Sequence, residues 1–521
     1  MRKQTPRRYV LGIDLGTTYS SVGVFTGNEV EILSDNFKEK SIPSVVTFTE
    51  NSEIHAGTLA KEEAVRNLDS TVYDSKRMIG HKYSDEVIQK GIKTWPFKVI
   101  RGCEDIPKIQ CRYDRFRKQF LPEEISSFIL KELKSIADDF YSADIREAII
   151  TVPADFNTQQ RLLTYKAGEL AGLKVLRVVD EPTAAAIAYG MNENVENKRT
   201  ILVFDFGGGT LDVSLLEANK DKIYNDEQVL GCKVIATSGD SNLGGQDFDN
   251  NLLNYLAEKF KEINHCDFRE DRRARLVMKN KCEVAKKTLS NKKNATILVP
   301  GLYNGLDFQY EIPPEVFDEI NSNLFDRILA PVKKVIDFAK IPKSSIEYIL
   351  VGGSSRLPTV QKILRDFFDG RGPSRFKNPN IGLEYAVVYG AAYVGYDMTN
   401  SSHSIIRIES TLPHSLGVEV HGGKMEKILH QNCPIPTRKV DEYTTASDYQ
   451  KEVRVKIYSG ESEIASENSY LGDIVLSGIT IAEKSKPVIE ITFEVTHEGI
   501  LKVYTKDKKT NAQKDVEVKY T

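Results

Sequence analysis

The chain has 521 residues, more than one hydrophobic core usually supports, and this predicts two to four domains. Hydrophobic residues make up 40% and charged residues 28% of it, as in ordinary globular proteins, and a net charge of −3 gives no overall reason to bind nucleic acid or a membrane. Six cysteines without a C-x-x-C pair argue against a zinc site or a disulfide framework and fit a reducing compartment.

The N-terminal sequence MRKQTPRRYVLGID is basic, but its apolar run is too short for a signal peptide. The sequence also contains no run of about 18 apolar residues that could span a membrane. We therefore expect a cytoplasmic protein with an N-terminal extension at residues 1–8. A short organellar leader within this extension is the alternative.

A β-hairpin is predicted at the start of the chain, where strands over residues 9–15 and 20–25 flank a Gly-Thr-Thr turn. Pro153 then ends a strand of the buried type, and a helix leads to the next strand, which is the α/β pattern. The elements predicted before residue 180 are helices at 60–68, 122–141 and 158–171 and strands at 148–152 and 174–179.

A second hairpin begins at Thr200 and repeats the first. ILVFDFGGGTLDVSLLEA and YVLGIDLGTTYSSVGVF both place an apolar strand before Asp, an apolar residue and Gly, and an alternating strand after them. Asp14 and Asp205 are 191 residues apart, which indicates two duplicated halves. Helices are predicted at 250–263 and 272–289, and a strand at 348–351 runs into Gly-Gly-Ser-Ser-Arg.

The sequence pattern changes after Thr399. Residues 400–410 form a polar and aliphatic linker, and residues 411–521 alternate apolar and polar side chains between turn signals. This alternation predicts an all-β sandwich.

The two hairpins share turns whose glycines let the backbone approach a ligand closely, so that N–H groups can converge on phosphate oxygens. Either turn alone is better explained as a tight hairpin turn, but the repeat favours two loops that grip one polyphosphate. The residues concerned are Gly16, Thr17, Thr18, Gly207, Gly208, Gly209 and Thr210.

Carboxylates surround these turns: Asp14, Asp205, Asp212 and, after another strand, Glu181. They would repel each other and a polyphosphate, which raises their pKa values. Mg²⁺ resolves this conflict because it prefers oxygen ligands, keeps several waters and bridges phosphates. Lys76 adds a positive charge, although composition alone favours a solvated helix lysine.

A helix face and a glycine-rich turn are candidates for binding the rest of a nucleotide. Spacing of three and four residues places the polar helix residues on one side, where they can bind ribose and adenine, and an arginine can stack on the base. In isolation, each is better explained as a solvated face or a turn. The residues are Glu283, Lys286, Lys287, Ser290, Gly352, Gly353, Ser354, Ser355 and Arg356.

Taken together, these strings closely resemble the seventy-kilodalton heat-shock (DnaK-type) chaperones over residues 9–521. The matching strings include GIDLGTTYSSVGV, DSKRMIG, ITVPADFN, VVDEPTAAAIAYG, FDFGGGTLDVSLL and VGGSSRLP. The resemblance implies an α/β fold, with a two-lobed actin-like (ribonuclease-H-like) ATPase domain before an all-β peptide-binding sandwich. We expect lobe I at 9–199, lobe II at 200–399 with the chain crossing back, the linker at 400–410 and the sandwich at 411–521.

The resemblance also implies roles for individual residues. Lys76 matches the catalytic lysine that positions the attacking water, and Asp14, Asp205 and Glu181 match the carboxylates around water and metal. Asp212 matches a cation-site carboxylate, Thr17, Thr18, Tyr19 and Thr210 match phosphate-loop residues, and the helix-face set matches the adenosine grip. Pro153 resembles a switch proline, and Arg161 and Arg177 resemble arginines that couple the domains and a J-domain partner.

The implied function is ATP-dependent binding and release of extended apolar segments of unfolded proteins, with ATP or ADP, Mg²⁺ and K⁺ bound, and with a J-domain co-chaperone and a nucleotide exchange factor as partners. A peptide would thread a channel in the sandwich. Without the resemblance, the matching residues are better explained as sandwich core. They are Val418, Val420, His421, Tyr443, Ala446, Val453 and Val455.

Several positions depart from the family pattern. Arg407 interrupts the aliphatic run of the linker, and because a buried arginine is costly unless paired, it argues against docking of the linker on the ATPase lobe. Asp155 replaces an aromatic residue, Lys287 replaces an arginine, residues 380–387 are altered, and His421 stands where an apolar residue arches over the peptide. The chain ends with the sandwich, so we expect no helical lid and rapid peptide exchange.

Two other functions compete with this one. A regulatory or scaffold subunit would bind ATP without strong coupling to peptide, as Arg407 and the missing lid suggest. A small-molecule kinase of the same fold would need a substrate site between the lobes, and the β-domain argues against it.

Overall fold

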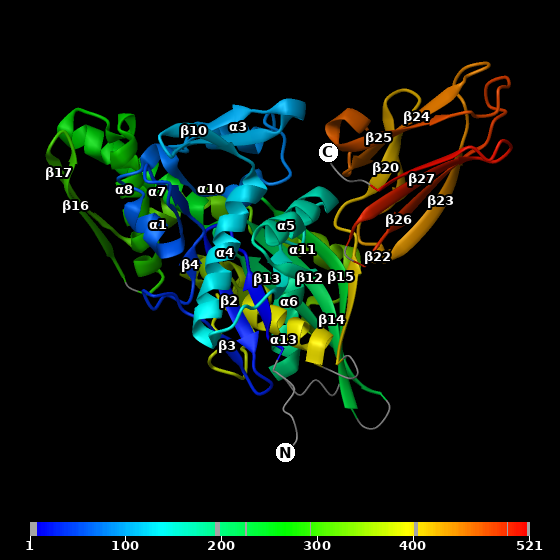
Figure 1. Cartoon of the computed structure of the whole chain (residues 1–521). Coiled ribbons are helices and arrows are strands. Elements are labelled where there is room, and N and C mark those ends of the chain that lie inside the picture. The colour runs from blue at the N-terminus through cyan, green and yellow to red at the C-terminus, as the bar shows by residue number, and fades with distance from the viewer. Residues whose placement is uncertain are drawn as a thin grey trace.

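The computed structural model describes residues 8–192, 198–223, 227–291, 293–400, 405–497 and 499–517 (Figure 1). Most of the predicted N-terminal extension and part of the linker lie outside the described residues. Within the part of the chain that is described, no helix is both long and apolar enough to cross a lipid bilayer.

The first sheet contains the predicted N-terminal hairpin, β1 (Val10–Asp14) and β2 (Tyr19–Phe25). β1 also pairs in parallel with β11 (Glu147–Val152), which pairs in parallel with β12 (Lys174–Asp180). The predicted crossover helix between these strands is α5 (Thr158–Leu170), and α4 (Pro122–Tyr141) has the expected bounds. The helix expected at 60–68 is the shorter α1 (Gly57–Glu63).

The second sheet repeats this arrangement. β13 (Arg199–Phe206) forms a hairpin with β14 (Leu211–Ile223) and pairs in parallel with β18 (Ile346–Val351) on its other side. In both sheets, the hairpin strand that carries the aspartate therefore has a parallel neighbour. This shared topology supports the duplication inferred from the sequence.

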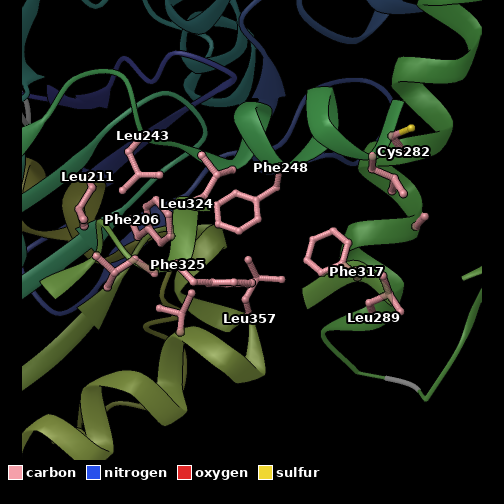
Figure 2. Packing of buried hydrophobic residues seen from close by; sticks show 14 of the residues in the cluster. Phe206, Leu211, Leu243, Phe248, Cys282, Leu289, Phe317, Leu324, Phe325 and Leu357 are labelled. Carbon is pink, nitrogen blue, oxygen red and sulfur yellow. The ribbon is translucent and has the colours of Figure 1, made fainter. Parts of the chain in front are cut away.

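Helix α11 (Leu329–Ala339) packs on β14 and β15 of the second sheet, while α7 (Gly245–Asn264) and α8 (Arg272–Leu289) pack on each other, and α8 also packs on β16 (Ala295–Tyr303) of a separate two-stranded sheet. Figure 2 shows Phe206 and Leu211, which flank the glycine turn, within the same packed cluster as Phe248 of α7. The rings of Phe206 and Phe248 meet edge to face with centroids 5.9 Å apart. Because both flanking side chains are fully buried, the core anchors the two ends of the turn.

Helices α6 (Glu181–Asn192) and α13 (Ala386–Asn400) pack together where the lobes meet. A Cβ atom at Gly390 would lie 1.8 Å from the Ala184 carbonyl oxygen, and one at Gly12 of β1 would lie 2.3 Å from the Ala392 backbone nitrogen. Only glycine permits these approaches, so small residues fix the separation of the lobes.

The linker docks on the second sheet, although Arg407 had argued against such docking. Residues Ile406–Thr411 form β19, which pairs in parallel with β15 (Glu227–Asp240) of the second sheet. Alternation along the strand buries Ile406 at 8% exposure, while the Arg407 side chain is 74% exposed and pairs with Glu409 at 2.9 Å. The expectation that Arg407 would oppose docking of the linker was wrong, because the Arg407 side chain faces solvent.

Two four-stranded antiparallel sheets form the C-terminal β-domain. One has the order β21-β20-β24-β25 and the other β23-β26-β27-β28. Their facing side chains form one apolar core that includes Ile457, Phe493 and Val503. The bounds are Leu416–Val420 (β20), Lys424–Leu429 (β21), Thr437–Tyr443 (β23), Glu452–Ser459 (β24), Ser469–Ser477 (β25), Ile489–Val495 (β26), Leu501–Asp507 (β27) and Gln513–Glu517 (β28).

The β-domain contacts lobe I at the loop that follows Pro153. Nε2 of His414 lies 3.0 Å from the carbonyl oxygen of Asp155, and the Thr158 hydroxyl donates to the Gly499 carbonyl oxygen at 2.9 Å. The backbone N–H of Thr237 in lobe II donates to Oδ1 of Asn432 at 3.1 Å. The β-domain is therefore docked on both lobes.

We predict that Ile406→Asp releases β19 from the second sheet, because an unpaired carboxylate at a buried position costs about 3 kcal/mol. Hydrogen exchange at the amide of Leu230, which donates to the Ile405 carbonyl oxygen at 2.8 Å, should become roughly 100-fold faster. Arg407→Asp is the matched control and should change this exchange less than threefold. Equal protection in the wild type and Ile406→Asp would contradict the docking.

Candidate nucleotide-binding site

A cavity of about 480 Å³ lies between the two lobes. All the nucleotide-site residues predicted from the sequence line this cavity except Asp212 and Ser355. The predicted residues that it brings together are Asp14, Gly16, Thr17, Thr18, Tyr19, Lys76, Glu181, Asp205, Gly207, Gly208, Gly209, Thr210, Glu283, Lys286, Lys287, Ser290, Gly352, Gly353, Ser354 and Arg356.

Glycine is required where the two phosphate-type turns approach each other. A Cβ atom at Gly208 would lie 2.0 Å from the Thr18 hydroxyl oxygen, and one at Gly209 would lie 2.6 Å from that of Thr17. The turns of the two lobes therefore interlock. Ser354 follows β18 and donates to the Gly207 carbonyl oxygen at 2.8 Å, which ties the third predicted motif to the second turn.

Carboxylates from both lobes meet at the base of the cavity. Asp14 ends β1, and burial followed by the nearby Glu181 charge raises its pKa to about 7. Burial and then the charges of Glu181 and Asp14 hold the pKa of Asp205 well above its usual range. These shifts mean that the protein's own groups compensate the negative charge poorly here.

Lys76 is the cation of this cluster. It lies in the short helix α2 (Ser75–Met78), is 8% exposed, and donates to Oε1 of Glu181 at 2.5 Å. Glu181 begins α6 and is equally buried. The solvated helix lysine favoured by composition alone is therefore not what the fold produces.

Asp212 stands behind the cavity lining. Its Oδ2 accepts a hydrogen bond from the Thr210 hydroxyl at 2.8 Å, while its buried Oδ1 has no hydrogen-bond partner among the described residues. No group of three His, Cys, Asp or Glu side chains in those residues is arranged to ligate an ion directly. An orphaned carboxylate oxygen beside several others fits a hydrated cation held mainly through its waters.

A hydrogen-bonded cluster that includes Tyr19 and Glu283 lies on the lining of the cavity. Lys61 donates to the Tyr19 hydroxyl and to Oε2 of Glu283, both at 2.9 Å, and Lys287 contacts Oε1 of Glu283 at 2.7 Å. Burial alone would raise the pKa of Glu283, but the charges of Lys61 and Lys287 and hydrogen bonds lower it to about 2. Because Tyr19 and Lys61 belong to lobe I, this carboxylate joins the lobes.

The remaining predicted adenosine residues also have partners in the protein. Lys286 donates to Oδ2 of Asp249 at 2.7 Å and to the Gly245 carbonyl oxygen at 2.6 Å. Arg356 pairs with Glu384 across the mouth of the cavity. These contacts hold the two side chains in place along the lining.

Sequence reasoning missed several lining residues. Gln246 donates to Oδ1 of Asp74 at 2.8 Å and to the Thr18 hydroxyl at 3.2 Å, so it joins the lobes beside the phosphate turns. Asp249 follows one turn later on the same helix, and Tyr385 lies in the altered segment 380–387. The string GQDFDN held the signal for Gln246 and Asp249, but the helix had been expected to start at residue 250.

The two lobes interlock around a cavity whose base holds carboxylates and a lysine. This arrangement defines an actin-like nucleotide-binding ATPase, here joined to a β-sandwich. Residues 10–521 match the family model described as Hsp70 protein. The chain therefore belongs to the Hsp70 family. It is an ATPase and an ATP-dependent molecular chaperone that binds unfolded polypeptides, and this family binds ATP or ADP with a divalent metal.

Individual relatives match over nearly the whole chain. The chain is 41% identical to the heat shock 70 kDa protein of Neurospora crassa over 510 residues, 98% of this chain and 77% of that protein. It is 40% identical over 504 residues to heat shock cognate 70 kDa protein 3 of Dictyostelium discoideum, 96% of this chain and 78% of the relative. It is 41% identical over 511 residues to a ribosome-associated molecular chaperone of Zygosaccharomyces rouxii, 98% of this chain and 81% of the relative.

We predict that Asp14→Asn stabilises the protein in the absence of nucleotide and metal. The pKa of Asp14 rises on folding from 3.8 to about 7, so the native state holds a proton that the unfolded state releases, and stability falls as the pH rises between these values. Asparagine carries no ionisable proton, so the Asp14→Asn variant does not lose this stability as the pH rises. Scanning calorimetry should show a thermal midpoint a few degrees higher than wild type at pH 8, with a smaller difference at pH 5.

Adding ATP with a divalent metal should reverse this order, because the wild type gains more stability from the ligands. A variant that is equally or less stable than wild type at pH 8 without ligands would contradict the unfavourable charge at Asp14.

Proposed function

We propose that Mg²⁺ accompanies ATP in the cavity, with Asp14, Asp205 and Asp212 holding it largely through water, and that K⁺ binds nearby. A bound Mg²⁺ would neutralise phosphate charge and orient the terminal phosphoryl group. The buried Oδ1 of Asp212, which has no hydrogen-bond partner among the described residues, carries this proposal, because the raised pKa values of Asp14 and Asp205 show that negative charge there is uncompensated.

The chemistry we propose is in-line attack of water on the γ-phosphoryl group. Lys76 positions the water, and Glu181, Asp205 and Asp14 order this water and the water shell of the metal. Thr210 and the turns with Thr17, Thr18 and Tyr19 grip the phosphates. Positioning and neutralisation of charge supply the rate enhancement, and no covalent intermediate forms. The adenosine is held by Glu283, Lys286, Lys287, Ser290, Gly352, Gly353, Ser354 and Arg356.

We predict that Lys76→Ala slows single-turnover ATP hydrolysis at least 100-fold, because the attacking water loses its cation and Glu181 loses its partner. Lys90→Ala is the matched control, since the Lys90 side chain is 69% exposed and pairs with Glu86 on the surface. It should hydrolyse ATP at the wild-type rate. Unchanged hydrolysis by Lys76→Ala would remove the catalytic assignment.

We further propose that residues 9–399 act as the nucleotide-binding domain, 400–410 as the linker and 411–521 as the peptide-binding domain, and that the protein works in the cytoplasm with a J-domain co-chaperone and a nucleotide exchange factor. The pairing of β19 with β15 and the contact of Arg161 with Asp180 at 2.6 Å, beside the docked β-domain, support coupling between the domains. They favour a coupled chaperone over the regulatory or scaffold alternative.

The proposed peptide channel mixes buried and accessible side chains. Val418 and Val455 are 2% and 4% exposed and lie in the sandwich core, while Val420, Tyr443 and Val453 pack at its border. The remaining two, His421 and Ala446, are exposed. The buried hydroxyls of Tyr443 and Thr445 have no hydrogen-bond partner among the described residues. A bound peptide backbone would supply such partners, and this supports the channel.

We predict that Tyr443→Phe weakens the binding of an extended apolar peptide about 5- to 10-fold without destabilising the free protein. An unpaired buried hydroxyl costs about 1–3 kcal/mol, so its removal is neutral or stabilising until a peptide pairs with it. Fluorescence anisotropy measures the affinity, and urea unfolding measures the stability. Loss of stability together with affinity would show that the hydroxyl serves the fold alone.

A further inference from the structure

A three-stranded sheet of lobe I presents one face to solvent. It contains β8 (Lys98–Arg101), β9 (Pro107–Tyr113) and β10 (Phe116–Phe120) in the order β10-β9-β8, near the top of the molecule in Figure 1. Alternate residues such as Val99, Ile109 and Phe120 point into the core of lobe I. The outward residues, placed by the strand register, are Lys98, Ile100, Lys108, Gln110, Arg112, Arg117 and Gln119.

This outward face, which we call the basic sheet face, carries four cations and no carboxylate on its strands. Within the part of the chain that the structure describes, Lys98, Lys108 and Arg117 make no ion pair, and Arg112 pairs with Glu50 at 3.0 Å, where both side chains are about two-thirds exposed. Arg112 and Arg117 are direct cross-strand neighbours. Like charges in this position destabilise a sheet, and an anion between them would remove the penalty.

Strand β10 is also a free edge of this sheet. It pairs with β9 on one side, no described strand pairs with its other side, and four of its five residues are exposed. An edge strand offers unpaired N–H and C=O groups, and charged side chains normally keep it from pairing with further strands. The same basic side chains would attract an acidic segment.

We propose that the basic sheet face binds an extended acidic segment of a partner protein, which pairs with β10 as an additional strand. The carboxylates of such a strand would recur every second residue, about 6.8 Å apart, on the side of Arg117 and Arg112. Phe116, which is 73% exposed at the hairpin tip, would contact the other side of the segment.

A protein segment fits this face better than a nucleic acid does. The outward positions of the three strands hold no aromatic side chain on which a base could stack, and stacking is a main source of affinity for single strands. Gln110 and Gln119 offer amide groups to a peptide instead. The exposed β10 edge adds backbone pairing that only a polypeptide can complete.

Fluorescence anisotropy of the full chain with ATP tests the proposal, using a labelled ten-residue Thr-Glu repeat that has no apolar residue for the peptide-binding domain. We expect Arg112→Glu with Arg117→Glu to weaken binding at least tenfold, and Arg117→Glu alone to weaken it severalfold. The matched control, Lys333→Glu with Lys334→Glu, makes the same charge change on the exposed side of α11 (Leu329–Ala339) and should bind within twofold of wild type.

A peptide methylated on alternate backbone nitrogens should bind at least tenfold more weakly, because it cannot complete the strand. ATP hydrolysis within twofold of wild type in every variant shows that they fold. Equal binding by the Arg112 and Arg117 variants, or by the methylated peptide, would overturn the proposal. Tighter binding of a twenty-nucleotide uridylate RNA than of the acidic peptide to this face would overturn it in favour of nucleic acid.

Discussion

The mutual repulsion of buried carboxylates at the junction of the lobes is the constraint on which the rest of the structure depends. Asp14 is the last residue of β1 and Asp205 the last but one of β13, which are equivalent strands of the two sheets, so the duplicated topology itself brings like charges together. Helices α6 and α13 pack closely where the lobes meet, with Gly390 against Ala184, so separating the lobes to relieve that repulsion would lose buried contacts. A cation and a phosphate group remain the physical means of compensation, and nucleotide binding therefore changes the free energy of the interface between the lobes.

The same cluster is in contact with the β-domain through a short loop. Nζ of Lys76 lies 5.7 Å from the ring centre of Phe156, whose carbonyl oxygen accepts a hydrogen bond from Nε of Arg161 at 3.0 Å. The neighbouring carbonyl oxygen of Asp155 meets His414 of the β-domain. Burial raises the pKa of the Asp155 carboxyl, so this departure from the family pattern adds a titratable group between the two domains. A chain of contacting residues therefore connects Lys76 to the β-domain.

Local sequence determined much of the ATPase fold. The apolar spacing predicted α4 and α8 with their observed bounds, and the glycine turns were recognised because the same pattern occurs in two hairpins. The structure adds that only glycine fits where the two turns interlock. Contacts formed by distant segments were harder to predict. Nothing in residues 400–410 indicates that β15 is their partner, and Arg407 was judged by its charge without regard to the alternation that turns it outward.

The net charge of the chain does not show how charged side chains are grouped on single elements. A net charge of −3 predicts no binding of polyanions, yet the basic sheet face gathers four cations on alternate positions of three adjacent strands. At physiological ionic strength, charges interact over about 8 Å, which is less than two strand spacings. A ligand at this face therefore responds to the arginines beside it and little to the acidic residues elsewhere on the molecule. The arrangement of charge on single elements decides which partners an Hsp70 surface can bind, and strand register, which the composition does not contain, determines that arrangement.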